Sequence, residues 1–356
     1  MQTSLEPTTR IEFIGEPAPF QSLATSSSRT NLYLVGGRQR AQRPLSAGNQ
    51  DWEGYDQGRI VEVQPQTGMW QPRVEHTSPS GDTQADSAII LQAGHIQGDE
   101  LFICSQTEVL IYHLPDFQIV ARYSLPCFND LHHARPSPDG NILVANAGLE
   151  MVLELSRDGN ILREWNVLGE DPWGAFSKQI DYRYISTKPH RSHPNYVFCI
   201  DDEIWVTRFH QGDAVCLTDP RKSIAISTER IHDGVVHDGL VYFTTVNGRI
   251  VIANPRTRRV EEVIDLNSMH EPGLVLGWCR GLYLDAGMVW VGFSRIRPTK
   301  FRENVSWVMH GFKRALPSHI ACYDLNQHRC VMELDIEPMG LGAIYSIFPS
   351  ENSTRD

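Results

Sequence analysis

The stretch RIHDGVVHDGLVYFTTVNGRIVIANPRTRRVEEVIDL, residues 230–266, contains four short runs of β-branched and aromatic residues separated by tight turn signals. Asp238-Gly239 and Asn247-Gly248 are the strongest signals, because two-residue hairpins favour Asp-Gly and Asn-Gly pairs between such runs. The stretch therefore predicts four antiparallel strands in about 37 residues, which is the size of one β-propeller blade.

The same four-strand pattern recurs along the chain. Comparable units cover residues 87–125, 131–166, 193–228 and, around an insert, 279–336. One strand, 343–350, is left over at the C-terminus, while the N-terminal strands that begin at 31 and 58 lack an inner strand. We expect the C-terminal strand to join the N-terminal blade and close a ring of six blades, because closure removes exposed sheet edges.

The fold class is therefore all-β, with one β-propeller domain over residues 1–356. We expect a polar N-terminal segment over 1–30 and inserts over 167–190 and 298–317. Five or seven blades are alternatives, because residues 1–86 are weakly patterned. A pair of β-sandwiches is an alternative fold, which the regular spacing of the units disfavours.

Composition narrows the class of protein. The net charge of −11 and the absence of a Lys/Arg cluster argue against a nucleic-acid partner. No apolar run approaches the about 18 residues of a membrane span, so we expect no membrane partner. The N-terminus lacks a signal-peptide core and the seven cysteines are scattered, which favours a cytoplasmic protein with reduced thiols. No motif for an organic cofactor is present, and the oligomeric state stays open.

A polar residue recurs near the start of successive units. It stands six to eight residues before the turn between the first two strands, and it is His132 or His133, then His193, His232 and Arg280. The first strand of each blade lines the central channel, so these side chains are expected to converge on one mouth of that channel. Alternation along a strand sends only one of the two adjacent histidines there, and we assign His133.

This set of residues predicts a metal site with an anion clamp. Three imidazoles from His133, His193 and His232 suit a divalent ion such as Zn, Fe, Cu or Ni, with Ca as a further alternative, and leave positions open for water or substrate. Arg280 can hold a carboxylate, phosphate or sulfate by a bidentate contact. The same four residues are the predicted catalytic residues, since without a metal one histidine can act as a general base or nucleophile.

Simpler interpretations stand beside this one. Propeller mouths are polar, and histidines there can bond to backbone carbonyls or water. Asp130, Asp233 and Glu271 are candidates to orient ligating histidines. The aromatic residues of the 167–190 insert form either a lid over the mouth or a packed layer on the blades; they are Trp173, Phe176, Tyr182 and Tyr184.

Two segments resemble known propeller families. WCRGLYLDAGMVWVGFSRIRP, residues 278–298, resembles the RGL and VGFSxIR signature of an uncharacterised bacterial β-propeller family. LHHARPSPDGNILVANAG, residues 131–148, is similar to the first strands of arylsulfotransferase-type and gluconolactonase-like propellers. These resemblances imply the propeller fold and carry no residue roles.

Fold alone does not specify function. We expect an enzyme of the hydrolase, lyase or isomerase type that processes a small oxygenated or anionic substrate at the histidine-lined mouth. The alternative is a non-catalytic propeller that binds a ligand or a protein partner, in which case an apolar patch on a blade face or mouth is expected.

Overall fold

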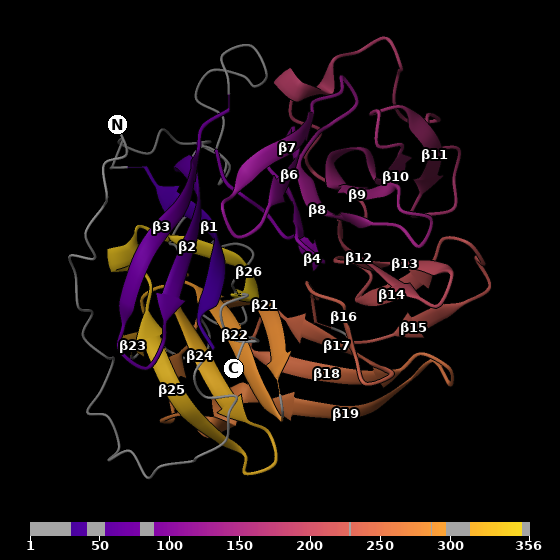
Figure 1. Ribbon diagram of the computed structural model, residues 1–356. Helices are drawn as coiled ribbons and strands as arrows, with labels where there is room; N and C mark the ends of the chain where they lie inside the picture. The colour runs from indigo at the N-terminus through magenta and orange to yellow at the C-terminus, as the bar shows by residue number, and fades with distance from the viewer. Residues whose placement is uncertain are drawn as a thin grey trace, which may run out of the picture.

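The computed structural model describes residues 30–40, 54–78, 89–227, 229–285, 287–296 and 314–350. These residues form six four-stranded antiparallel sheets, which follow one another around a common centre as propeller blades (Figure 1). The polar N-terminal segment and most of the predicted 298–317 insert lie outside the described residues. Among the helices of the described residues, none has the length and apolar character needed to cross a membrane.

The strands of each blade are given from the innermost outwards. The first three blades consist of β26 (Ala343–Pro349), β1 (Leu32–Gln39), β2 (Tyr55–Gln64) and β3 (Met69–His76); β4 (His95–Gln97), β5 (Glu100–Cys104), β6 (Val109–His113) and β7 (Gln118–Tyr123); and β8 (Leu131–Pro136), β9 (Ile142–Asn146), β10 (Met151–Leu155) and β11 (Ile161–Asn166). The next three consist of β12 (Pro194–Ile200), β13 (Glu203–Arg208), β14 (Asp213–Cys216) and β15 (Ser223–Ala225); β16 (Val235–His237), β17 (Leu240–Thr245), β18 (Arg249–Asn254) and β19 (Arg259–Asp265); and β21 (Trp278–Asp285), β22 (Met288–Ser294), β24 (His319–Asp324) and β25 (Arg329–Asp335).

The remaining elements are short. A parallel pair joins β20 (Leu274–Val275) to β23 (Arg314–Ala315), and the single-turn 3-10 helices are η3 (Ala147–Leu149), η4 (Tyr182–Tyr184), η5 (Leu266–Met269) and η7 (Glu337–Met339).

The 230–266 stretch forms the fifth blade, as its turns predict. Asp238 and Gly239 have φ of 48° and 76°, the left-handed conformations that a two-residue hairpin turn between twisted strands requires. Gly248, with φ of 86°, supplies the same freedom between β17 and β18. The local chemistry of the turns therefore determines the order of the four strands.

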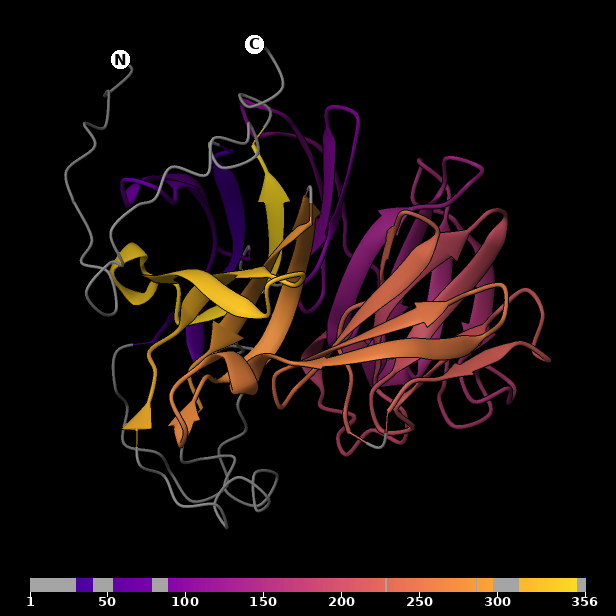
Figure 2. The ribbon, with the colours of Figure 1, turned by 90° about the horizontal axis from the view of Figure 1, so that it is seen from below.

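The C-terminal strand closes the ring, so the predicted six-bladed closure is confirmed. β26 pairs antiparallel with β1 from Leu32↔Pro349 to Gly37↔Ala343, so the first and the last strand of the described residues lie in one sheet (Figure 2). Gly36 permits this pairing, because a Cβ at that position would lie 1.9 Å from the carbonyl oxygen of Ala343.

The hydrophobic core lies between neighbouring blades. One cluster packs the second blade against the third, with Phe102, Ile111, Val144 and Leu153 fully buried. Equivalent clusters join the fourth to the fifth blade and the fifth to the sixth. Burial between blades makes the ring mutually supporting, since each sheet covers an apolar face of the next.

Candidate functional site

Several innermost strands carry an extra residue where they pass the centre of the ring. On β8 the pairing register shifts by one and leaves His132 opposite no residue of β9. A similar shift leaves Tyr345 of β26 opposite no residue of β1, and another falls at Arg280 and Gly281 of β21. Such β-bulges re-aim side chains and are common at barrel rims and beside active sites.

These bulged residues meet the histidines that precede the next inner strands. The rings of His132 and His193 are 4.3 Å apart, and those of His132 and His232 are 6.4 Å apart. The His232 ring is 6.1 Å from that of Tyr345, and the guanidinium carbon of Arg280 lies 3.9 Å from the Tyr345 ring centre. Side chains on, or directly before, the innermost strands of five blades thus converge, including three of the four predicted site residues.

Two aromatic side chains complete the arrangement. Trp278 has its ring 5.9 Å from the guanidinium carbon of Arg280 and stacks on Phe209 at 6.3 Å. Phe209 in turn contacts His193 edge-on at 5.3 Å. We call this closed set of contacts the central circuit; its members are His132, His193, Phe209, Trp278, Arg280, Tyr345 and His232.

His133, the histidine assigned to the channel from the sequence, lies outside the central circuit. Its Nε2–H donates to the carbonyl oxygen of Gly94 at 3.1 Å, and its Nδ1 accepts the backbone N–H of Val197 at 3.1 Å. The ring is fully buried and stacks on Tyr196 at 3.8 Å. Burial holds the pKa of His133 well below its usual value. Both nitrogens are therefore occupied by backbone groups, and His132 takes the position expected of His133.

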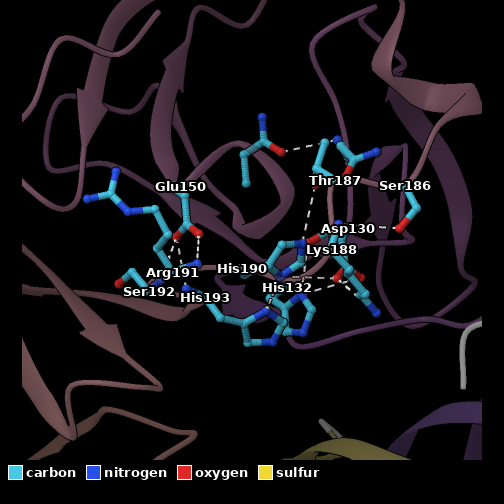
Figure 3. Close-up of polar contacts among 12 residues, drawn as sticks. Asp130, His132, Glu150, Ser186, Thr187, Lys188, His190, Arg191, Ser192 and His193 are labelled. Carbon is cyan, nitrogen blue, oxygen red and sulfur yellow. Dashed lines mark hydrogen bonds and ion pairs between the residues drawn. The ribbon is translucent and has the colours of Figure 1, made fainter. Parts of the chain in front are cut away.

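A group of possible metal ligands adjoins the central circuit. One ligand atom each from Asp130, His190 and His193 lies within 4.8 Å of the others (Figure 3). Asp130 precedes β8, His193 precedes β12, and His190 comes from the insert between β11 and β12. Asp130 and His193 have φ of 47° and 61°, a left-handed conformation that is uncommon for non-glycine residues but that Asp and His adopt more readily than most.

Hydrogen bonds determine which imidazole nitrogens carry lone pairs. Thr187 donates its hydroxyl proton to Oδ1 of Asn129 at 3.0 Å, so its oxygen accepts from Nε2–H of His190 at 3.3 Å. This leaves the Nδ1 lone pair of His190 facing Nδ1 of His193 at 2.6 Å. His132 donates its Nδ1–H to the Asp130 carbonyl oxygen at 2.9 Å, which leaves its Nε2 as an acceptor.

The carboxylate of Glu150 holds the segment that carries His193. Its oxygens accept the backbone N–H groups of Arg191, of Ser192 at 3.0 Å and of His193 at 2.9 Å (Figure 3). Three consecutive amides bound to one buried carboxylate keep this turn in place. The backbone of His193 is therefore held in place by Glu150.

The charges of the group favour metal-ligand chemistry. Burial lowers the pKa of His132 to about 4 and lowers those of His190 and His193. Burial opposes ionisation of Asp130, but the nearby cations, first of all Lys188 at 3.5 Å, outweigh it and bring the pKa of Asp130 well below its usual range. The site thus presents one carboxylate and three neutral imidazoles near pH 7.

Arg280 enters the central circuit from β21, where its neighbours are Trp278 and Tyr345. It is half-buried, its Nε has no hydrogen-bond partner, and the described part of the chain gives it no ion pair. By contrast, Arg208 at the end of β13 and Arg295 just after β22 pair with Asp213 and Glu337. Arg280 is therefore available to an anion in a way that the other two arginines are not.

The 167–190 insert contributes polar residues to the site, whereas its aromatic residues pack elsewhere. Trp173, Phe176 and Tyr182 pack against the core of the third blade. Its end, however, supplies Lys188 and His190 to the cluster. Lys188 was missed from the sequence, although a lysine and two histidines within KPHRSH, directly before an inner strand, were a usable signal.

No protein-family model and no curated protein sequence matches the chain. Among solved structures, it is similar to a protein of unknown function from Bacteroides caccae, with TM-score 0.59 and 15% identity over 90% of this chain and 99% of that one. A streptogramin B lyase gives TM-score 0.46 and 13% identity over 86% and 87% of the two chains. A catalytically inactive virginiamycin B lyase from Staphylococcus aureus with quinupristin gives 0.45 and 14% over 89% and 88%.

These likenesses concern the fold alone. At 15% identity the Bacteroides caccae structure supports the architecture and says nothing about chemistry. The two lyases, with TM-scores of 0.46 and 0.45, are too distant for their activity to bear on this chain. No family model supports the bacterial signature or the arylsulfotransferase-type similarity noted in the sequence.

Proposed function

We propose that this protein is a metal-dependent enzyme that acts on a small anionic, oxygenated molecule at the centre of its ring. The observation that carries the proposal is the convergence of Asp130, which precedes β8, with His190 and His193, which precede β12, with their ligand atoms within 4.8 Å. Compared with the set expected from the sequence, His193 is retained, while Asp130 and His190 replace His133 and His232 as ligands.

Two imidazole nitrogens and one carboxylate oxygen suit a divalent transition metal and leave coordination positions open. The Nε2–H of His190 is held by Thr187, which directs its Nδ1 towards the metal position, as outer hydrogen bonds do for ligating histidines. The ammonium of Lys188 lies 3.5 Å from Oδ2 of Asp130 and neutralises this carboxylate. A bound metal ion would neutralise the same carboxylate in its place. When bound, the ion polarises a carbonyl or lowers the pKa of a water molecule.

The remaining residues of the site are proposed to act on the substrate. Arg280 binds an anionic group such as a carboxylate by charge-assisted hydrogen bonds. His132, with an acceptor at Nε2 and its ring 4.3 Å from that of His193, is placed to take a proton from a substrate or water next to the ligands. This combination supports hydrolysis, elimination or isomerisation; His232 and Tyr345 shape the space between.

Metal analysis of the purified full-length protein tests the proposal. Relative to wild type, His190→Ala and Asp130→Asn are expected to lose one equivalent of divalent metal per chain. His328→Asn is the matched control, because His328 lies exposed in a turn with φ of 48°, which asparagine also tolerates. Wild-type metal content in both site variants would overturn the metal assignment.

Catalysis is tested separately. The metal-loaded protein is incubated with hydroxy acids, lactones, and phosphate and sulfate esters, and products are followed by proton NMR. Turnover that requires metal and disappears in His132→Ala, with metal content retained, supports the enzyme. Metal and anion binding without any turnover would instead favour the non-catalytic ligand-binding propeller.

A further inference from the structure

A second group of metal-ligand side chains lies between the fifth and sixth blades, away from the central circuit. Ligand atoms of His270, Cys330 and Glu333 are within 4.8 Å of one another. His270 directly follows η5, at the end of the fifth blade, while Cys330 and Glu333 belong to β25 of the sixth. His319, at the start of β24, has its Nε2 at 4.0 Å from Oε1 of Glu333.

The hydrogen bond of His319 leaves a lone pair directed at this group. Its Nδ1–H donates to the carbonyl oxygen of Pro317 at 2.9 Å, so Nε2 is the acceptor nitrogen of the neutral ring. The side chain is completely buried, and neither Nε2 nor Oε1 of Glu333 has a hydrogen-bond partner. Two buried acceptors that face each other destabilise the fold unless a proton or a cation lies between them.

His270 supplies a third acceptor in the tautomer whose Nε2–H donates to Tyr323. Its Nε2 is 2.9 Å from the hydroxyl of Tyr323, and its Nδ1 is 3.3 Å from Oε1 of Glu333. With Nε2–H donated to Tyr323, the Nδ1 lone pair points to the carboxylate, which is the arrangement of a ligating histidine with its outer partner. No lysine or arginine of the described residues forms an ion pair with Glu333.

We propose that His270, His319, Cys330 and Glu333 form a second metal site, with zinc as its expected ion. Two imidazoles, a thiolate and a carboxylate make a donor set of borderline softness, which zinc accepts in tetrahedral geometry. Tetrahedral zinc separates its ligand atoms by about 3.3–3.8 Å. Because the three clustered ligand atoms spread over up to 4.8 Å, binding draws the side chains together by about 1 Å.

Four protein ligands leave no position open, so this ion is structural. It connects the segment after β19 to β24 and β25, and thereby fastens the fifth blade to the sixth. The site shares no residue with Asp130, His190 and His193, and it stands or fails independently of the enzymatic proposal.

Cobalt substitution tests the site, because a cobalt–thiolate bond produces a near-ultraviolet charge-transfer absorption that imidazole and carboxylate ligands do not. The full-length protein is stripped with a chelator and titrated with Co²⁺. Wild type is expected to develop this absorption, together with the visible bands of tetrahedral cobalt, and to lose both when Zn²⁺ is added. The other proposed group, Asp130, His190 and His193, contains no thiolate and therefore contributes no charge-transfer band, so this band reports the second site alone.

Cys330→Ser is expected to abolish the charge-transfer band, and His319→Gln to weaken Co²⁺ binding by more than about tenfold, since even outer-shell changes cost that much. Cys322→Ser is the matched control on the neighbouring strand β24 and is expected to keep the band. Circular dichroism of the metal-free variants checks that each is folded. Absence of the band in folded wild type, or its persistence in Cys330→Ser, would overturn the proposal.

Discussion

Replacing His133 by phenylalanine distinguishes a structural histidine from a metal ligand. The ring links two blades, because it donates to Gly94 before β4 and accepts from Val197 on β12. β12 is the innermost strand of its sheet, so this N–H has no further strand on the inner side to pair with. Phenylalanine keeps an aromatic ring against Tyr196 and removes both hydrogen bonds.

The expected destabilisation follows from the two backbone groups left buried and unsatisfied. Each unsatisfied group costs about 1–3 kcal/mol. The free energy of unfolding is therefore expected to fall by about 2–6 kcal/mol. The larger ring adds to this through overpacking, because the site is completely buried. A change of this size is well above the about 0.5 kcal/mol typical of surface substitutions.

Urea unfolding at pH 7 with a chelator present measures this difference without any contribution from bound metal. His328→Asn, in an exposed turn, is the control and is expected to stay within about 0.5 kcal/mol of wild type. Metal content is determined on the same preparations. If His133→Phe were as stable as wild type and had lost its metal, the structural assignment would be refuted and the ligand role restored.

Three further predictions concern an anion, a proton and the ring closure. Arg280→Gln is expected to weaken binding of small carboxylates about 10- to 100-fold by calorimetry, because one charge-assisted contact contributes about 1.5–3 kcal/mol. The free-energy difference between wild type and Glu108→Gln is expected to shrink by about 2.5 kcal/mol as pH falls from 4.5 to 2 in urea unfolding. The reason is that, although burial opposes ionisation, hydrogen bonds, first from His76, bring the pKa of Glu108 down to about 2. Gly36→Ala is expected to cost about 3 kcal/mol or more in urea unfolding, because its Cβ would overlap the Ala343 carbonyl that pairs β26 with β1.

Each of these has a matched control. Arg280→Lys keeps the charge but loses the bidentate geometry, so it should recover only part of the binding; full binding by Arg280→Gln would rule out an anion clamp. For the pH effect, the stabilisation by a carboxyl with a lowered pKa is present above its unfolded pKa and lost below it, so parallel pH profiles would contradict the role of Glu108. Gly174→Ala, where a Cβ meets only ordinary contacts, should leave stability within about 0.5 kcal/mol of wild type.

Much of the fold was accessible from the sequence because its decisive contacts are local. The turns at Asp238-Gly239 and Asn247-Gly248 join strands that are adjacent in the chain, and glycine supplies the left-handed conformation that each turn needs. Ring closure was also predictable, since the C-terminal strand lacked partners and the first blade lacked an inner strand.

The candidate site was predictable in part. His193, His232 and Arg280 do converge, because residues at the same place in successive blades must meet around one axis. The choice between His132 and His133 was not decided by alternation. A bulge at His132 changes which side chain faces the centre, and bulges depend on pairing with another strand.

The amino-acid sequence by itself determined the strands, their turns, the number of blades and the positions where polar side chains gather near the axis, since each depends on neighbouring residues or on simple repetition. Only the tertiary structure brought His190 and Lys188 from the insert to Asp130, and His270 to His319 and Glu333 across two blades. Such meetings depend on how loops cross between sheets and on how the closed ring spaces its blades, and neither is encoded in the local pattern of any one segment.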